Sequence, residues 1–147
     1  MRTGTITLAI DSQLDSVFLV GQAVAAICGA SPLGAAKARE VEAAVVEAVN
    51  NAIEHAYGNQ SGHRVEVVIE LQAGCVVCRV CDRGRTMQQS PSNLAEAAGE
   101  GAEEPTEGGR GFMIMRSLMD QVSYARAGDQ NVLTLVKTFD PTRVSIR

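Results

Sequence analysis

The sequence predicts a two-layer α/β sandwich in which helices cover one face of a mixed, mostly antiparallel sheet. Two features support this class. Stretches in which apolar residues alternate, as on half-buried strands, are interleaved with stretches that carry apolar residues at helical spacing. They follow one another in the order β-α-α-β-β-α-β-β, with a long segment of no regular pattern before the third helix. The 147 residues are expected to form one domain, residues 1–147, that buries its own core.

The first half of the chain predicts one strand and two long helices. Residues 3–10 alternate and predict the strand, and Asp11 or Ser12 is expected to cap the helix that follows. A second helix, rich in Ala and Glu, is predicted over residues 33–57, with Gly58 as its stop. The apolar face expected on the first helix consists of Leu14, Val17, Phe18, Gly21, Val24, Ala25 and Cys28.

The second half predicts two hairpins separated by an irregular segment and a helix. Residues 64–71 and 75–82 alternate on either side of Ala73-Gly74, which predicts an antiparallel pair. Residues 83–109 have no strand period and are rich in Gly, Ser, Pro and Glu, so we expect a functional lid or a disordered loop. The regular pattern then resumes with a helix at 112–122 and strands at 123–127 and 132–139.

The charge balance and the hydropathy exclude several classes of protein. The chain has 13 Lys and Arg residues against 17 Asp and Glu residues, a net charge of −4, which argues against nucleic acid as the main partner. No apolar run approaches the roughly 20 residues of a membrane span, and the N-terminus lacks a signal-peptide layout. We therefore expect a cytoplasmic protein. Five acidic residues fall in the predicted lid, namely Glu96, Glu100, Glu103, Glu104 and Glu107.

The four cysteines do not predict a metal site. Cys75, Cys78 and Cys81 have the spacing of part of an iron–sulfur or zinc motif. They fall on a predicted strand, however, where side chains alternate between faces, so Cys78 should point away from the other two. We expect these residues and Cys28 to serve mainly as small buried hydrophobic groups.

A polar face on the predicted second helix is the first candidate for chemistry. A solvated surface is one explanation. However, adjacent Asn residues within a helix cost stability, and no Lys or Arg at i+4 balances the carboxylates. At 100° per residue the residues that gather on this face are Glu47, Asn50, Asn51, Glu54 and His55.

Two further places carry polar or glycine-rich motifs. Asp82 ends a predicted buried strand and Gly84 follows, which fits either a carboxylate at a pocket rim or an ordinary turn. Residues 108–112, Gly-Gly-Arg-Gly-Phe, lead into a predicted helix, whose free N–H groups would suit phosphate. A flexible hinge is the alternative. The segment is neither a Walker A loop nor a dinucleotide fingerprint.

In this order, the three motifs resemble the Bergerat (GHKL) nucleotide-binding fold shared by DNA gyrase, the Hsp90 chaperone, histidine kinases and MutL. The N box would be EAVNNAIEHAY at 47–57, followed by the Asp82-x-Gly84 box and the Gly box at 109–112. The short length and the run GGRGFMIMRSLMDQVSY are similar to bacterial anti-sigma factor serine/threonine-protein kinases of the RsbW/SpoIIAB type.

The resemblance implies roles at the phosphate end of the site. Glu47 would be the general base, and Asn51 would hold a Mg²⁺ ion that bridges the phosphates of ATP. The i, i+4 spacing puts both residues on one helix face. His55 either flanks the phosphates or is structural. The motif that would wrap the phosphates consists of Gly109, Arg110, Gly111 and Phe112.

The resemblance also implies roles at the adenine end. Asp82 would bind the adenine amino group, Gly84 would let the base lie close to the backbone, and Met87 could cover it. Members of the family often carry Gly-Thr before the last strand, where the Thr supports the adenine site. This chain has Asn131-Val-Leu-Thr134 there, and Thr134 is the residue we expect to substitute.

The function implied by the resemblance is an ATP-dependent protein serine kinase in a partner switch. Its substrate would be a STAS-domain anti-sigma factor antagonist, and a homodimer of the kinase would sequester a sigma factor. A PP2C-type phosphatase would act on the same antagonist. The alternatives are a partner switch on a target that is not a sigma factor, a non-catalytic nucleotide-dependent binding module, and an ATP hydrolase.

Overall fold

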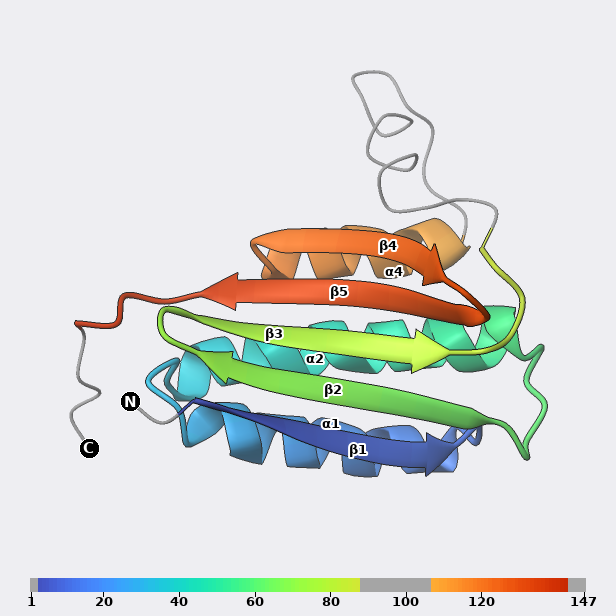
Figure 1. Cartoon of the computed structure of the whole chain (residues 1–147), viewed down its shortest axis with the longest axis horizontal. Coiled ribbons are helices and arrows are strands. Elements are labelled where there is room, and N and C mark those ends of the chain that lie inside the picture. The colour runs from blue at the N-terminus through green and yellow to red at the C-terminus, as the bar shows by residue number, and fades with distance from the viewer. Residues whose placement is uncertain (1–2, 88–106, 143–147) are drawn as a thin grey trace, which may run out of the picture.

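The computed structural model describes residues 3–87 and 107–142 (Figure 1). Most of the predicted lid, residues 88–106, lies outside the described residues. Within the described ranges, no helix is long and apolar enough to cross a membrane.

The strands form one five-stranded sheet in the order β1-β2-β3-β5-β4, and every neighbouring pair is antiparallel. Both predicted hairpins are present, and β3 and β5 lie side by side near the middle of the sheet (Figure 1). The predicted fold class is confirmed, with an antiparallel sheet instead of a mixed one. The strands are β1 Gly4–Asp11, β2 Arg64–Gln72, β3 Cys75–Asp82, β4 Gln121–Ala127 and β5 Gln130–Thr138.

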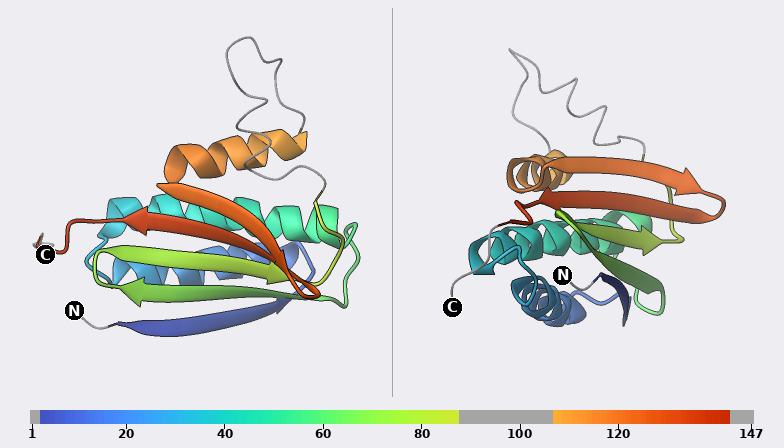
Figure 2. Two further views of the ribbon diagram at one scale, coloured as in Figure 1. Left: turned by 45° about the horizontal axis from the view of Figure 1, so that its top comes forward. Right: turned by 60° about the vertical axis from the view of Figure 1, so that its left-hand side comes forward.

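The helices all lie on one face of this sheet (Figure 2). The core fills the space between the two layers, where inward positions of β2 such as Val65, Val67 and Ile69 are fully buried. Burial of such side chains stabilises the fold by roughly 1.5–3 kcal/mol each. The helical elements are α1 Asp15–Gly29, α2 Ala35–Asn51, the π-helix η1 Ala52–Ala56, and α4 Glu107–Leu118.

The start of α1 differs from the prediction. Leu14 is the N-cap, without a side-chain cap. Asp11 ends β1 and accepts a hydrogen bond from the Gly62 N–H, and the Ser12 hydroxyl donates to the Gln60 carbonyl. Both polar side chains therefore fasten the loop before β2. Phe18 was expected on the buried face but is 68% exposed, because only a narrow stripe of α1 contacts the core.

The predicted second helix changes character at its end. α2 stops at Asn51, and η1 continues with hydrogen bonds that span five residues, such as Tyr57 N–H to Ala52 O. The wider turn breaks the 100° spacing. Asn51, still on regular α2, is buried, whereas Glu54 and His55 on η1 are exposed. Gly58, at a φ of 57°, ends the helical segment where it was predicted to.

The predicted helix at 112–122 is shifted along the chain. α4 spans Glu107–Leu118, so the glycine motif at 109–111 lies within its first turns and not before it. Val122 instead belongs to β4, where it pairs with Leu135. Pairing with β5 overrides the local helical pattern, and α4 packs mainly against α2.

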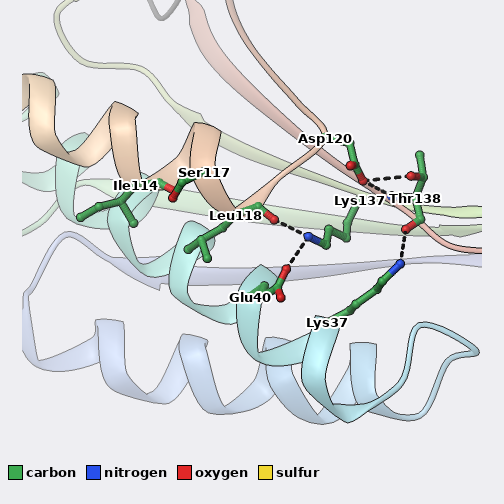
Figure 3. A network of polar contacts seen from close by, with 8 residues as sticks. All are labelled: Lys37, Glu40, Ile114, Ser117, Leu118, Asp120, Lys137 and Thr138. Atoms are coloured by element: carbon green, nitrogen blue, oxygen red, sulfur yellow. Dashed lines mark hydrogen bonds and ion pairs between the residues drawn. The ribbon is translucent and has the colours of Figure 1, made fainter.

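A buried lysine joins the two layers at one end of β5 (Figure 3). The Lys137 ammonium donates to the Glu40 carboxylate of α2 and to the Leu118 carbonyl at the end of α4. Nearby, the Asp120 carboxylate accepts hydrogen bonds from the N–H and hydroxyl of Thr138. These contacts fix the carboxyl end of α4 against α2 and β5.

The cysteines behave as small core residues with one exception. Cys28, Cys78 and Cys81 are buried, and Cys75 is half-buried. The Cys28 and Cys78 thiols are hydrogen-bonded to each other across the layers. That bond lowers the pKa of Cys28 and, together with burial, raises the pKa of Cys78.

Candidate functional site

Glu47 and Asn51 lie one turn apart on α2, and α4 passes close to both. A methyl group placed on the Gly111 Cα would lie 3.0 Å from Asn51 Nδ2 and 3.3 Å from Glu47 Oε2. The absence of a side chain at Gly111 therefore lets α4 approach a carboxylate and an amide closely. The structure brings together three residues that the sequence separates by up to 64 positions.

The Asn51 side chain is only 6% exposed. Among the described residues, its Nδ2 atom is buried and has no hydrogen-bond partner. Leaving a buried polar group unpaired costs roughly 1–3 kcal/mol, and such groups are rare in folded proteins. An unpaired amide that lines a cavity is a candidate group for binding a polar ligand.

Asp82 lies at the end of β3, where two donors hold one of its oxygens. Oδ1 accepts from Gly84 N–H at 2.9 Å and from Asn131 Nδ2 at 2.8 Å. No hydrogen bond from a described residue reaches Oδ2. Burial raises the pKa of the Asp82 carboxyl, and the bonds from Asn131 and Gly84 partly oppose that rise. The second oxygen therefore remains available to a ligand.

A narrow cavity of about 10 Å³ connects the two groups. Its walls are mainly apolar, and Asp82 and Asn51 supply the polar lining. Such a volume holds about one water molecule, so a larger ligand requires the walls of the cavity to move. The Met87 N–H donates to the Tyr124 hydroxyl at 3.0 Å. The lining consists of Ala48, Asn51, Ala52, Ala56, Val80, Asp82, Met87, Tyr124 and Leu133.

Gly84 is required by the backbone of η1. A methyl group at Gly84 would lie 2.3 Å from the Ala56 carbonyl oxygen, and the next residue, Arg85, donates its N–H to that oxygen at 2.9 Å. Beside it, the Tyr57 hydroxyl accepts from the Arg83 N–H at 2.7 Å. The motif after β3 is thus fastened directly to the end of the motif on α2.

Residues 10–137 match the family model described as the histidine kinase-like ATPase domain. The chain belongs to this family. A domain of this family binds a nucleotide, and the matched region contains all three sequence motifs and the cavity that Asn51 and Asp82 line.

Two curated relatives indicate a smaller group of proteins within the family of this histidine kinase-like ATPase domain. It is 33% identical over 109 residues to an anti-sigma F factor from Pasteuria penetrans, covering 71% of this chain and 70% of that protein. It is 30% identical over 81 residues to an anti-sigma F factor from Clostridium botulinum, covering 55% of this chain and 56% of that one. The predicted resemblance to the RsbW/SpoIIAB type is confirmed.

A solved structure shows the same fold. The histidine kinase domain of the blue-light activated histidine kinase from Erythrobacter litoralis EL346 matches 88% of this chain with a TM-score of 0.54 at 17% identity. The match spans 61% of that chain, so it bears on the fold alone.

Two predicted site residues of this ATPase domain are not among the residues that line the cavity. Thr134 lies on the sheet face opposite to its neighbours Leu133 and Leu135, which are buried toward the helices, and it does not line the cavity. Asn131 supports Asp82 in its place. Phe112 is 3% exposed and packs in the core, so its part in wrapping the phosphates stays a prediction.

The remaining predicted residues fall into two groups. Met87 lines the cavity, and its role in covering the base stays a prediction. Gly109 and Arg110 lie in the first turn of α4, near the residues that face Gly111. His55 is exposed and is not among the cavity-lining residues, so its place beside the phosphates stays a prediction.

Sequence reasoning missed Asn131 and Tyr124. Asn131 fell just before the predicted strand at 132–139, although it is the direct partner of Asp82 across β3 and β5. Its position as a polar residue opposite the end of the buried strand β3 could have indicated this role. Tyr124 carries no such signal, because its position depends on how β4 pairs with β5.

Proposed function

We propose that this protein is an ATP-dependent protein serine kinase that phosphorylates a STAS-domain anti-sigma factor antagonist and sequesters a sigma factor in the same partner switch. One observation carries the proposal. Asn51, a buried amide with an unpaired nitrogen, lies between the Asp82 cavity and the Glu47 carboxylate. A nucleotide whose base meets Asp82 would therefore direct its phosphates toward Glu47.

The base end is suited to adenine. Its amino group would donate to the Asp82 carboxylate, while the apolar walls of the cavity would cover the ring faces. Pockets of this kind combine apolar walls with a few placed polar groups. Met87 and Tyr124 lie where they can close over the base.

The phosphate end is suited to transfer. The glycine motif at 109–111 lies in the first turns of α4, where free N–H groups and the helix dipole favour anions. Arg110 is exposed there and can add a charge-assisted bond to a phosphate oxygen.

In this proposal Glu47 is the general base. Its carboxylate would accept the proton of the substrate serine hydroxyl while that oxygen attacks the γ-phosphorus. The bond from the γ-phosphorus to the bridging oxygen breaks, and ADP leaves with the electron pair. Positioning and proton removal of this kind are the protein's main contribution to phosphoryl transfer.

The residues present fit a magnesium ion. Mg²⁺ usually takes one or two protein oxygens and completes its shell with phosphate oxygens and water. The Asn51 amide, which lines the cavity, would supply the protein oxygen. When bound, the ion would neutralise charge on the phosphates.

The proposed partners follow from the relatives. Two anti-sigma F factors at 30–33% identity support a sigma factor as one partner. Membership of the RsbW/SpoIIAB type supports a STAS-domain antagonist as the substrate and a PP2C-type phosphatase that acts on it. The exposed apolar side chains of α1, Phe18 and Leu19 at 68% and 67% exposure, support a homodimer, since such patches often form interfaces.

The test is phosphoryl transfer followed by intact mass. The protein is mixed with Mg·ATP and candidate STAS-domain antagonists, and a gain of one phosphoryl group on the antagonist is expected. Glu47→Gln and Asn51→Ala should each abolish most of the transfer, whereas the matched control Glu54→Gln, at an exposed carboxylate of the neighbouring η1, should not. Transfer that persists in the first two variants would refute the site assignment.

Two further outcomes separate the alternatives. Nucleotide binding without modification of any antagonist would favour the non-catalytic binding module, and release of free phosphate alone would favour an ATP hydrolase. A pull-down with purified sigma factors then tests sequestration. We expect the protein to capture a sigma factor when the unphosphorylated antagonist is absent, and to lose it when that antagonist is added.

A further inference from the structure

We propose that Arg126 is a specificity-determining positioning residue. Acting through Asn131, it fixes the Asp82 carboxylate as a hydrogen-bond acceptor, so that the site selects a purine with an amino group at position 6 over one with a carbonyl there. This inference rests on the proposed binding of an adenine nucleotide at Asp82.

Arg126 is fastened to the outer side of the base end by three oxygens. Its Nη1 lies 2.7 Å from Thr86 Oγ1 and 3.0 Å from Asn131 Oδ1. The same nitrogen is 3.4 Å from the Gly84 carbonyl oxygen. Arg126 and Asn131 are direct partners in the β4–β5 hairpin, so the strand register itself sets this contact.

The arginine determines which way the Asn131 amide points. A guanidinium only donates hydrogen bonds, so the amide oxygen must face Arg126. The amide nitrogen then faces the other side, where it donates to Asp82 Oδ1, Gly84 O and Arg85 O at 2.8–3.2 Å. A reversed amide would place a carbonyl oxygen against the carboxylate and N–H groups against a cation.

Asn131 has no capacity left for a ligand. Its side chain is 1% exposed, its nitrogen has three acceptors, and its oxygen accepts from both Arg126 and Thr86. The polar atom of this cluster that remains toward the cavity is Asp82 Oδ2. Discrimination between bases therefore depends on whether this oxygen accepts a hydrogen bond from the base or donates one to it.

Arg126 favours the accepting state. Burial disfavours the ionised carboxylate, whereas the Asn131 N–H and the positive charge of Arg126 both lower the pKa of Asp82. An ionised carboxylate is an acceptor only. Adenine presents an amino donor at position 6, and guanine presents a carbonyl oxygen. Guanine would therefore bring one acceptor against another.

The test measures the affinities of ATP, GTP and inosine triphosphate by calorimetry on the full chain. Inosine triphosphate carries a carbonyl at position 6 but lacks the 2-amino group of guanine, so it isolates the position in question. The wild type should prefer ATP. Arg126→Met should reduce the ratio of ATP to inosine triphosphate affinity by about tenfold, the effect of one hydrogen bond. Arg126→Lys should restore part of it.

The matched control is Arg83→Met. Arg83 is also exposed and close in sequence to the base end, where it pairs with Asp129 at 3.7 Å, so this variant removes the same charge without touching Asn131. Its affinity ratio should equal that of the wild type. An equal fall in both arginine variants, or equal weakening of all nucleotides by Arg126→Met, would overturn the inference. A wild type that binds no nucleotide would overturn the proposed function as well.

Discussion

Two buried polar clusters lie at opposite ends of β5, and they differ in one respect. At one end, Asp82 and Asn131 meet beside Asn51. At the other, Lys137 meets Glu40 of α2 and the end of α4 (Figure 3). We refer to them as the base cluster and the anchor cluster.

The polar groups of the anchor cluster have hydrogen-bond partners, whereas two polar atoms of the base cluster and its neighbour Asn51 have none among the described residues. The Lys137 ammonium has a carboxylate and a carbonyl as acceptors. Asn51 Nδ2 has no partner among the described residues, and Asp82 retains an oxygen toward the cavity. Both clusters bury polar groups in a low dielectric, where unmet bonds are costly. The comparison therefore distinguishes a structural tie from a ligand site, and it can be tested by removing each in turn.

The largest expected effect is on catalysis. Glu47→Gln should lower the rate of phosphoryl transfer by about 10²–10⁴-fold, the usual contribution of a general base. ATP affinity should change by less than about threefold, since the amide keeps the shape of the side chain. The rate is measured by intact mass of the antagonist and the affinity by calorimetry. A loss of both in proportion would mean that Glu47 binds nucleotide instead of acting on the proton.

Breaking the anchor cluster should affect stability alone. Lys137→Met leaves the Leu118 carbonyl without its donor, and we expect the free energy of unfolding to fall by about 1–3 kcal/mol. At this chain length the melting temperature should drop by roughly 2–4 °C per kcal/mol. ATP affinity of the folded protein should stay within about twofold. A selective loss of ATP binding would show that the two ends of α4 are coupled.

Adding a methyl group at Gly111 of α4 should have the opposite pattern of effects, in which ATP binding weakens and stability is not lost. The added methyl of Gly111→Ala would lie 3.0 Å from Asn51 Nδ2, so we expect ATP affinity to fall by about tenfold. Stability should hold or rise, because Ala favours a helix over Gly by about 1 kcal/mol. Gly29→Ala, whose methyl would make only an ordinary contact at 3.9 Å with Ala38, serves as the control and should leave affinity unchanged.

The smallest effect is the pH dependence of the base cluster. Burial raises the pKa of Asp82, so the folded protein keeps this proton to higher pH than the unfolded chain. The contribution of Asp82 to stability is therefore greatest below the unfolded pKa and falls as pH rises toward the folded pKa. ATP affinity should rise by a few-fold through that folded pKa, as the acceptor forms.

This titration can be assigned to Asp82. Tyr57 and Tyr124, the neighbouring tyrosines, have pKa values raised mainly by burial and do not ionise in that window. Asp82→Asn should abolish both trends. A midpoint that survives in this variant would assign the titration to another group.

The sequence predicted the fold class and much of the site for a physical reason. Strand alternation and helical spacing are local, and the i, i+4 relation of Glu47 and Asn51 survives in any regular helix. The switch to a π-helix at Ala52 was not predictable in this way. It depends on contacts beyond the helix, such as the Ala56 carbonyl accepting the Arg85 N–H.

The base end shows the same limit. Thr134 matched the expected residue type, but its place three residues along β5 from Asn131 puts its side chain on the wrong face of the sheet. The residue that does contact Asp82 is set by the pairing of β3 with β5. Strand register is a tertiary property, and a single sequence does not specify it.

The most direct test of the central claim is calorimetric titration of ATP into three proteins: the wild type, Asp82→Asn and Lys137→Met. Asp82→Asn removes the charged acceptor while keeping its shape, so affinity should fall by about 10–100-fold with stability unchanged or slightly raised. Lys137→Met should bind ATP like the wild type while melting earlier. Equal ATP affinity in the wild type and Asp82→Asn would contradict the assignment of the base cluster as the nucleotide site.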